Sequence, residues 1–336
     1  MLWGDDATAP VMTRALASHE RHAERLGYPM KVLRYSLANH YWNKVYWLQE
    51  IIVHELSKPP NERLEWLMWA DADTILLNPS FHLEAFLPPH DMRNIHFICA
   101  KDWNGLNNGV FFIRVSEETA EYVARVIAYP LFKPEVHLEW PEQSAMQLTF
   151  NESAQYHEQV AYMPQHWFNG YIREVQPGDL LAHFAGVDNR HEEMDAWLDK
   201  IEGSDAADWD IYDPWSPSLH KRIMEIGHFW EIVKNFRGIA AKMSHDLFEY
   251  HGMHIADMPA EVYSTIVHFK DASYFSTDDE GDLARALMAV EDAVKSVYDK
   301  ELPALLKYNP EWRLLMRNER LDDGAFQKPT KLEEFH

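Results

Sequence analysis

The chain has 336 residues, 46 % of them hydrophobic, and a formal net charge of −23, because 54 Asp and Glu outnumber 31 Lys and Arg. This acidity argues against nucleic acid and anionic membrane surfaces as partners, since phosphate contacts need a basic surface. It would also repel a nucleoside diphosphate unless a cation stood between the two. We therefore expect no nucleic-acid partner and no membrane contact in the chain as given. Length suggests about two domains, and the oligomeric state is not fixed by the sequence.

The first half of the chain alternates between helical and strand-like patterns. VMTRALASHERHAERL, residues 11–26, has the spacing of a helix that GYP ends, and residues 42–56 predict a second amphipathic helix. MKVLRYSL, residues 30–37, predicts a strand, and so do WLMWADADT, NIHFICAKD and NGVFFIRV. This alternation indicates an α/β domain with a mostly parallel sheet, in which ligands bind at the carboxyl ends of the strands.

The composition changes in DKIEGSDAADWDIYDPWSP, an acidic segment that contains two prolines. We predict an α/β domain over 1–200, an acidic linker over 201–216, a helical extension over 217–317 and a charged tail over 318–336. Two apolar stripes at helical spacing predict core-facing helices in the extension. They are Ile223, Ile226, Trp230, Val233, Phe236, Ile239, Met243 and Leu247, then Leu283, Leu287, Val290, Val294 and Val297.

The sequence gives few indications of the compartment. The single cysteine, Cys99, excludes an internal disulfide, and no stretch reaches the ~18 apolar residues of a membrane span. The opening MLWGDD resembles the end of a strand, so we expect the true N-terminus, with any anchor, to lie upstream. If the N-terminus is instead complete, a cytoplasmic location follows.

Asp71 and Asp73 end the apolar run WLMWADADT, and Ile75-Leu76-Leu77 follow almost at once. Two carboxylates at i and i+2 of an extended strand point to the same face. Buried carboxylates need a partner, and Mg²⁺ or Mn²⁺ fits oxygen ligands of this kind. We predict a metal site here, against the plainer alternative of an Asp that caps a turn beside a solvated one.

A rival interpretation starts from the same residues. DADTI is similar to the D-x-D-x-T strand end of haloacid-dehalogenase-type phosphohydrolases, in which Asp71 would be the nucleophile and Asp73 the general acid. In that family the motif opens the domain, whereas some 70 residues precede it here. GDLARALMAVED, residues 281–292, is a poor match for the acidic pair that completes such a site, because it lies in a helical stripe.

Three further segments carry polar residues next to predicted elements. Asn107 and Asn108 directly precede a strand, where their amides could bind sugar hydroxyls or simply serve the turn. His183, in LLAHFAGV, is a metal ligand or a core histidine, and Gly186 after it would let backbone N–H groups approach a phosphate. In WPEQSAMQ a helix starts at Pro141, with Glu142 and Gln143 in its first turn.

Taken in order, these segments resemble glycosyltransferase family 34, the Golgi α-galactosyl-, α-mannosyl- and α-xylosyltransferases. The resemblance rests on Trp42-x-Lys44, WLMWADADTILLNP, NGLNNGVFFIR, EQSA and HFAG, and covers roughly residues 1–200. It implies a GT-A-like fold, Rossmann-type, with helices on both faces of a nucleotide-sugar-binding sheet. It also implies a UDP- or GDP-sugar donor, a glycan acceptor, Mn²⁺ (or Mg²⁺), retention of anomeric configuration, and a Golgi or secretory location.

The resemblance assigns roles to individual residues. The metal would be held by Asp71, Asp73 and His183. Donor contacts would come from Asp71, Asp73, Gly186, Lys44, Trp3, Gly4 and Asn107, and the catalytic side chains would be Gln143, Glu142 and Asn108. Gln143 would lie beneath the anomeric carbon, and front-face transfer is expected because no carboxylate is placed as a nucleophile.

Two departures from the family pattern stand out. Val187-Asp188 occupy the place where some members carry a phosphate-binding Lys, and the first strand is cut to MLWG. A third hypothesis is therefore a non-catalytic glycosyltransferase-like protein whose helical half binds a partner chain. The aromatic residues Trp103, Trp140, Trp167 and Phe168 are candidates for stacking on acceptor sugars, although core packing is the favoured interpretation for any one of them. Asn169 and Tyr171 are weaker candidates, and Asn151-Glu152-Ser153 is a glycosylation sequon.

Overall fold

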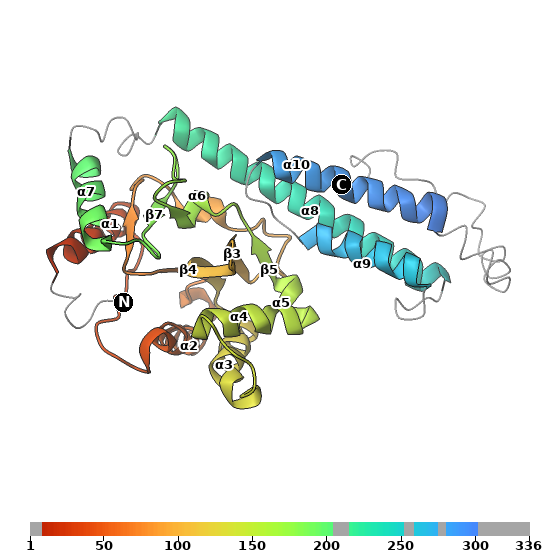
Figure 1. The fold of residues 1–336 in the computed structure, drawn as a ribbon, viewed down its shortest axis with the longest axis horizontal. Coiled ribbons are helices and arrows are strands. Elements are labelled where there is room, and N and C mark those ends of the chain that lie inside the picture. Colours follow the sequence, from red (N-terminus) through yellow and green to blue (C-terminus); the bar gives the residue numbers. More distant parts are fainter. Residues whose placement is uncertain (1–8, 204–214, 252–258, 275–279, 302–336) are drawn as a thin grey trace. The chain divides into compact units, whose positions relative to one another are not determined.

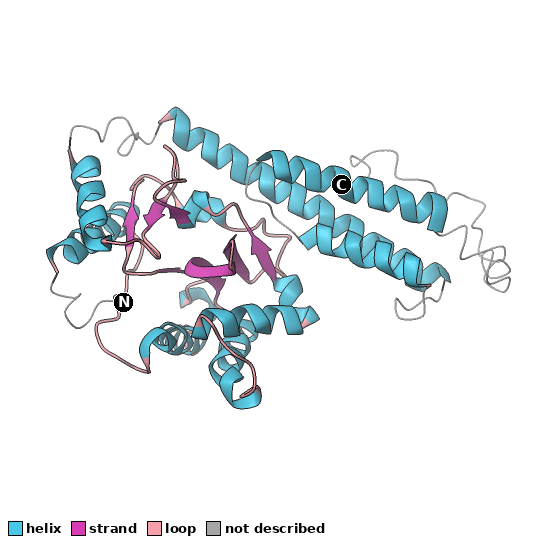
Figure 2. Cartoon of the chain, viewed as in Figure 1, coloured by secondary structure: helices cyan, strands magenta, loops and turns pink. Residues whose placement is uncertain are grey.

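The computed structural model describes residues 9–203, 215–251, 259–274 and 280–301. The chain divides into two compact units, Met1–Gly227 and His228–His336. Among the described residues, strands occur only in the first unit, where helices flank them, and the second unit is helical (Figure 1, Figure 2). The predicted α/β class and the helical C-terminal extension are therefore confirmed.

The described strands of the first unit form two sheets. One sheet has the order β1-β4-β3-β5, and the other has the order β2-β7-β6. The strands are β1 (Trp66–Ala70), β2 (Thr74–Leu76), β3 (Phe97–Asp102), β4 (Gly105–Arg114), β5 (Val160–Tyr162), β6 (Gly170–Tyr171) and β7 (Leu181–His183). β1 runs directly into β2, so the short turn between them joins the two sheets.

The expectation of a mostly parallel sheet is wrong for the described strands. β1 and β3 both pair antiparallel with β4, β2 pairs antiparallel with β7, and only β3–β5 and β6–β7 are parallel. The reason lies between β3 and β4, where only Trp103 and Asn104 connect the strands. So short a connection permits only an antiparallel hairpin, and Asn-Gly is the strongest sequence signal for one. Gly105 supplies the positive φ of +104° that the turn needs.

The helices before and around these strands agree closely with the sequence patterns. The first two predicted helices appear as α1 (Pro10–Leu26) and α2 (Asn43–Leu56), and the helix predicted from Pro141 appears as α4 (Pro141–Glu152). The other α-helices among the described residues of the first unit are α3 (Glu117–Phe132), α5 (Ala154–Gln159), α6 (His166–Asn169) and α7 (Arg190–Glu202). The start of α8 (Pro217–His251) also lies in this unit.

Two apolar clusters hold the first unit together. Helices α2, α3 and α4 bury their apolar sides against the four-stranded sheet, around residues such as Phe97, Phe111 and Tyr122. Helices α1 and α7 enclose β2 and β7 in the second cluster, which includes Ile75 and Phe184. Figure 1 shows α2, α3 and α4 together on one side of β4, with α6 and β7 on the other side. The turn between β1 and β2 therefore lies where the two packed layers meet.

The strand predicted over residues 30–37 is wrong, since this segment has no strand in the structure. Met30 and Tyr35 are exposed, so the apolar residues of the segment do not share one buried face. At its end, the Asn43 side chain takes over the backbone bonding. Asn43 Oδ1 accepts from the N–H groups of Leu37 and Ala38 at 2.5 and 2.8 Å. A side chain that satisfies the backbone in this way competes with pairing into a sheet.

In the second unit, α8 continues and is followed by α9 (Ala260–Tyr274) and α10 (Glu280–Ser296). The predicted stripes are buried at Trp230, Phe236 and Val290, among others, but Ile223, still in the first unit, is 41 % exposed, contrary to expectation. Residues 204–214 of the predicted linker and the charged tail lie outside the described residues. The predicted division at residues 201–216 thus stays a prediction, although α7 already reaches Glu202.

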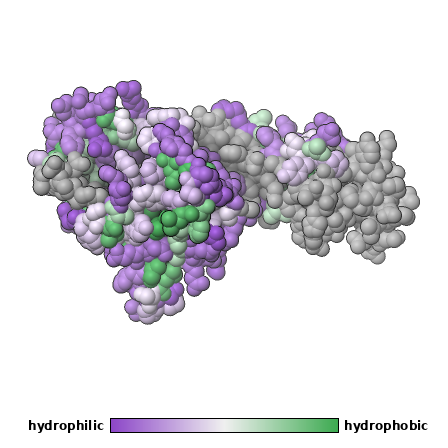
Figure 3. All heavy atoms as spheres, turned by 60° about the horizontal axis from the view of Figure 1, so that its bottom comes forward, coloured by the Kyte–Doolittle hydropathy of each residue, from purple (hydrophilic) through white to green (hydrophobic). Residues whose placement is uncertain are grey.

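The face in Figure 3 is largely hydrophilic over the described residues, with apolar patches between the polar ones. Large apolar side chains that reach the surface include Leu131 at 81 % exposed and Trp103 at 79 %. Among the helices that the structure describes, none contains a stretch long and apolar enough to cross a membrane.

Candidate functional site

The Asp71-Ala72-Asp73 turn is fixed by backbone contacts on both sides. The N–H of Asp71 donates to the carbonyl of Gly109 at 2.8 Å, and the N–H of Phe184 donates to the carbonyl of Asp73 at 2.9 Å. The hydroxyl of Thr74 closes the turn by donating to the Asp71 carbonyl at 2.7 Å. The two carboxylates thus follow β1, a strand in which only Trp69 is fully buried, because the chain turns there from one sheet into the other.

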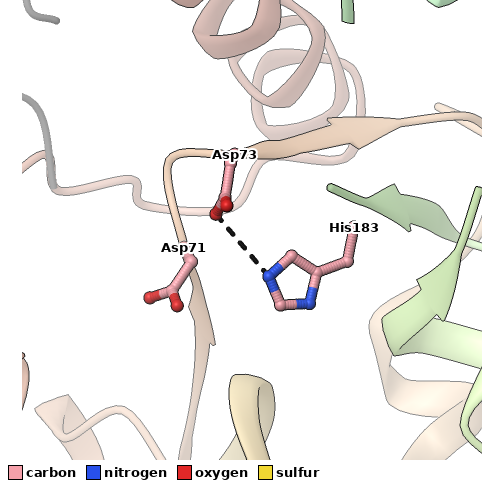
Figure 4. Close-up of side chains that lie close together, drawn as sticks. All are labelled: Asp71, Asp73 and His183. Carbon is pink, nitrogen blue, oxygen red and sulfur yellow. Dashed lines mark ion pairs between the residues drawn. The ribbon is translucent and has the colours of Figure 1, made fainter. Parts of the chain in front are cut away.

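His183 meets this turn from the far end of the domain's sequence. In the antiparallel pairing of β2 with β7, Thr74 is the register partner of His183. Ligand-type atoms of Asp71, Asp73 and His183 lie within 4.8 Å of one another. His183 Nε2 is 3.6 Å from Asp73 Oδ1, and Figure 4 shows the Asp73 carboxylate turned toward the imidazole. The three residues predicted to hold a metal are therefore brought together.

The Asp73 carboxyl is prepared to remain ionised. Burial would raise its pKa, but contact with His183 and the positive charge of Arg190 hold the pKa of Asp73 well below its usual range. Arg190 Nη1 donates to Asp73 Oδ2 at 3.1 Å from the first turn of α7. Sequence reasoning missed Arg190. The signal that could have found it is a cation seven residues after His183, in a chain that lacks the Lys expected nearby.

The orientation of His183 is set from behind. Asn169, which is fully buried, accepts from His183 Nδ1 through its Oδ1 at 2.8 Å, and this assigns the proton to Nδ1. Nε2 is then the ring nitrogen that faces Asp73, 3.6 Å from its Oδ1. Gly109 makes the space for the ring, because a Cβ there would lie 2.1 Å from His183 Cε1. Asn169, a weaker candidate in the sequence, is thus a direct partner of a candidate ligand.

Lys44 lies behind Asp71 and is almost completely buried. Its Nζ is 3.2 Å from the Asp71 carboxylate and donates to Asn108 O and Oδ1 at 2.8 and 3.0 Å. Glu142 Oε1 also lies near this amine, 3.6 Å from Nζ. Trp69 Nε1 donates to Asp71 Oδ1 at 2.7 Å. The charge and the N–H groups of Lys44 are therefore satisfied by side chains and backbone of the protein itself. Asp71 in turn contacts both Lys44 and Trp69.

The amides and the start of α4 join this cluster. Asn108 donates through its backbone N–H to Gln143 Oε1 at 3.0 Å and through Nδ2 to Glu142 Oε1 at 3.1 Å. Asn107 Nδ2 donates to Tyr171 Oη at 2.7 Å, and its Oδ1 accepts from Asn169 Nδ2 at 2.9 Å. The structure thus brings together Asn107, which the resemblance assigns to donor contact, and the three side chains that it assigns to catalysis.

The remaining predicted residues fall in three groups. Gly186 has a φ of +64° and nothing within 4 Å of a Cβ built there, so its backbone faces open space. Trp3 and Gly4 lie outside the described residues. Trp167 and Phe168 are buried, at 1 % and 0 % exposed, so core packing, the alternative that the sequence favoured, is confirmed for both. Both are core side chains, whereas Trp103 and Trp140 are exposed.

A comparison with known families bears on this arrangement. Residues 88–193 match the model of the galactosyl transferase GMA12/MNN10 family. The predicted resemblance to this family is confirmed. The matched range includes Asn107, Asn108, Glu142, Gln143, Asn169, His183 and Arg190, while the Asp71–Asp73 turn lies before it.

Curated relatives carry related names. The chain is 27 % identical to an alpha-1,2-galactosyltransferase of Schizosaccharomyces pombe, over 61 % of this chain and 65 % of that protein. It is 20 % identical to the probable alpha-1,6-mannosyltransferase MNN10 of Saccharomyces cerevisiae, over 56 % of this chain and 53 % of that protein. The chain thus spans less than two thirds of either relative. A solved glycosyltransferase involved in glycosylation of the major capsid of PBCV-1 is 16 % identical, with a TM-score of 0.43, over 58 % of this chain and 96 % of that one.

Proposed function

We propose that this protein is a metal-dependent retaining glycosyltransferase of the secretory pathway. It moves a hexose or pentose from a UDP- or GDP-sugar to a glycan acceptor. The observation that carries the proposal is the convergence of Asp71, Asp73 and His183 within 4.8 Å in a chain that resembles the family. The charge of the chain supports a cation between protein and donor, because a protein with a net charge of −23 would otherwise repel a diphosphate.

The donor set fits the ion. Two carboxylates and one imidazole suit Mn²⁺ better than Mg²⁺, which prefers a shell made of oxygen ligands. Because Nδ1 is bonded to Asn169, Nε2 is the ring nitrogen that would bind the ion. When bound, such a cation neutralises the diphosphate and stabilises it as a leaving group.

Lys44 and Arg190, the two cationic side chains next to the site, have different roles. Lys44 is 2 % exposed and surrounded by Asp71, Asn108 and Glu142, so it positions these groups rather than binding phosphate. Arg190 is 40 % exposed while it contacts Asp73. Guanidinium donors suit phosphate oxygens. Arg190 therefore binds the diphosphate in place of the Lys that some members of the family carry and that this chain lacks.

The environment of Glu142 favours front-face transfer. Its carboxylate accepts from Asn108 and lies 3.6 Å from Lys44, so it is held within the protein rather than presented as a nucleophile. Gln143, whose Oε1 binds the backbone of Asn108, presents an amide instead. In such a reaction the acceptor oxygen bonds to the anomeric carbon on the face from which the phosphate oxygen leaves, and the acceptor's hydroxyl proton passes to that departing oxygen. A covalent glycosyl adduct trapped on Glu142 would overturn this part of the proposal.

The test is calorimetry with Mn²⁺ and a panel of UDP- and GDP-sugars. Wild-type protein should bind one donor only when Mn²⁺ is present. Asp73→Ala should lower this affinity at least about 100-fold while the protein stays folded by circular dichroism, because one carboxylate ligand and the contact of His183 with it are lost. Asp199→Ala is the matched control, since Asp199 is an exposed aspartate on α7 that pairs with Arg14. Unchanged donor binding by Asp73→Ala would contradict the assignment.

One contact favours the phosphohydrolase alternative, because the site of such enzymes also contains a Lys. Lys44 Nζ lies 3.2 Å from the carboxylate of Asp71. That reaction needs Asp71 but not His183. Phosphatase turnover of p-nitrophenyl phosphate that survives His183→Ala and is lost in Asp71→Asn would replace the transferase proposal. A folded protein that binds no nucleotide under any condition would favour the non-catalytic hypothesis.

A further inference from the structure

An exposed indole stands at the tip of the β3–β4 hairpin. Trp103 is 79 % exposed and occupies one of the two residues that link the strands. The turn beneath it is fixed, since Asp102 Oδ1 accepts from the N–H of Asn104 at 2.6 Å. A hairpin of this kind needs Asn-Gly for its backbone but has no need of a tryptophan. The ring is therefore unexplained by the local fold.

The indole is part of an ordered aromatic and polar surface. Its ring centroid lies 5.3 Å from that of Tyr171, at an interplanar angle of 54°. The hydroxyl of Tyr171 donates to Asp102 Oδ2 at 2.6 Å and accepts from Asn107 Nδ2 at 2.7 Å. Tyr171 is thus locked by the strands on either side of the turn. A flat apolar ring here stands beside a carboxylate and amides.

This surface borders the candidate metal cluster. Tyr171 is the register partner of His183 in the β6–β7 pairing, and their ring centroids are 6.0 Å apart. Asn107 and Asn169 form a second connection, because Asn169 binds both Asn107 Oδ1 and His183 Nδ1. A molecule lying on Trp103 would therefore be adjacent to a sugar held at the metal, not in its place.

Sugars match such a surface chemically. One face of a pyranose presents C–H groups that pack on an aromatic ring, while its edge presents hydroxyls for carboxylates and amides. Trp103 presents such a ring at the surface, held against Tyr171 and beside Asp102 and Asn104. Trp140, the other exposed candidate, precedes the first turn of α4, and among the described residues no aromatic ring packs on it as Tyr171 does on Trp103.

We infer that Trp103, with Tyr171 and Asp102, forms a subsite for a pyranose unit of the glycan acceptor. The inference rests on the proposed function, because it makes this unit the acceptor neighbour of the transferred sugar. The indole packs on the C–H face, and Asp102 and Asn104 lie beside the hydroxyl edge. Trp103 then contributes to the choice of acceptor rather than of donor.

The test is saturation-transfer NMR on the full chain with methyl α-mannopyranoside, methyl β-galactopyranoside and methyl β-glucopyranoside as probes. Saturation should reach the C–H protons of at least one glycoside in wild-type protein. Trp103→Ala should weaken this binding about tenfold, and Trp103→Phe should restore part of it because a ring remains. Trp215→Ala is the matched control, since Trp215 is 78 % exposed and stacks on His220 at the start of α8.

Calorimetry with Mn²⁺ and nucleotide sugar separates this inference from the proposed function. Trp103→Ala should bind metal and nucleotide as wild type does. Equal glycoside binding by wild type and Trp103→Ala, or no binding of any glycoside to wild type, would overturn the subsite. Glycoside binding that depends on Trp103 in a protein without metal-dependent nucleotide binding would support a sugar subsite and overturn the transferase.

Discussion

Two charge clusters of the first unit use the same residue types in opposite surroundings. Around Lys44, the cation is 2 % exposed and its partners Asp71 and Glu142 are 26 % and 5 % exposed. Around Arg14, the cation is 29 % exposed and binds Asp195, Asp199 and Glu202 of α7, which are 54 %, 73 % and 33 % exposed. Each cluster joins segments distant in the sequence.

The difference between them lies in what water can do. Around Arg14, water and salt replace each ion pair at little cost, so the cluster joins α1 to α7 without determining the fold. Around Lys44, water has no comparable access, and removing one charge leaves the others uncompensated. A buried cluster of this kind, beside a candidate metal site, holds its carboxylates in place at all times. Three variants measure this contrast.

Lys44→Met should give the largest effect. It removes the cation between Asp71 and Glu142 and leaves two acceptors of Asn108 without a donor, so we expect a loss of about 3–5 kcal/mol in the free energy of unfolding. Urea denaturation measures this loss. Adding Glu142→Gln to the variant should recover part of it, because the buried charge is then gone.

Arg125→Met is the control for Lys44→Met. Arg125 pairs with Glu121 one turn earlier on α3, and both side chains are more than half exposed. Its replacement should change stability by about 0.5 kcal/mol or less. Equal losses in the two variants would show that burial does not determine the cost of removing a cation.

His19 should give an intermediate, pH-dependent effect. It lies on α1 as Arg14 does, but its Nε2 donates to the carbonyl and hydroxyl of Thr74, directly after Asp73. Burial lowers the pKa of His19 to about 4. Between that value and the ordinary value of about 6.5, the unfolded chain binds a proton that the folded chain does not, so stability falls as pH falls through this window.

His19→Gln removes the titration and keeps a donor near the same place. Between pH 7 and pH 4.5 the variant should therefore lose about 2 kcal/mol less of its free energy of unfolding than wild type does. The change in urea midpoint across pH measures this difference. His137→Gln, whose side chain is 84 % exposed, should follow the wild-type curve. Parallel curves for wild type and His19→Gln would contradict a neutral buried His19.

The Asp71–Asp73 pair was predictable from the sequence because its signal is local, two carboxylates at the end of an apolar strand. His183 joined the pair only through the resemblance, since a histidine that ends another apolar strand fits a core position equally well. Arg190 was not predictable in this way, since its approach to Asp73 depends on how α7 begins after Asn189, a residue at a positive φ of 52°. The role of Asn169 likewise comes from tertiary contact, as a buried amide gives no pattern of its own in the sequence.

The fold shows the same division between local and distant signals. Helical periodicity predicted α1 and α2 closely, whereas the direction of the strands was predicted wrongly. The alternation of helices and strands favours a parallel sheet, but Asn104-Gly105 favours a hairpin, and the hairpin makes β3 and β4 antiparallel. The pattern of MKVLRYSL favoured a strand, but the Asn43 side chain binds the backbone at the end of this segment instead.

Arg14→Met should give the smallest of the three effects, about 1 kcal/mol or less at low salt, because water can solvate all three carboxylates that it leaves. Hydrogen bonding to Glu202 raises the pKa of Arg14 above its ordinary value, so the arginine stays charged at any pH at which the fold is stable. The diagnostic is salt. At 1 M NaCl the screening length falls to about 3 Å, and the difference from wild type should shrink toward zero, while the loss in Lys44→Met persists. Urea is the denaturant for both series, since guanidinium chloride would itself screen the charges. A loss in Arg14→Met that equals the loss in Lys44→Met and does not respond to salt would mean that the α1–α7 cluster behaves as a buried one.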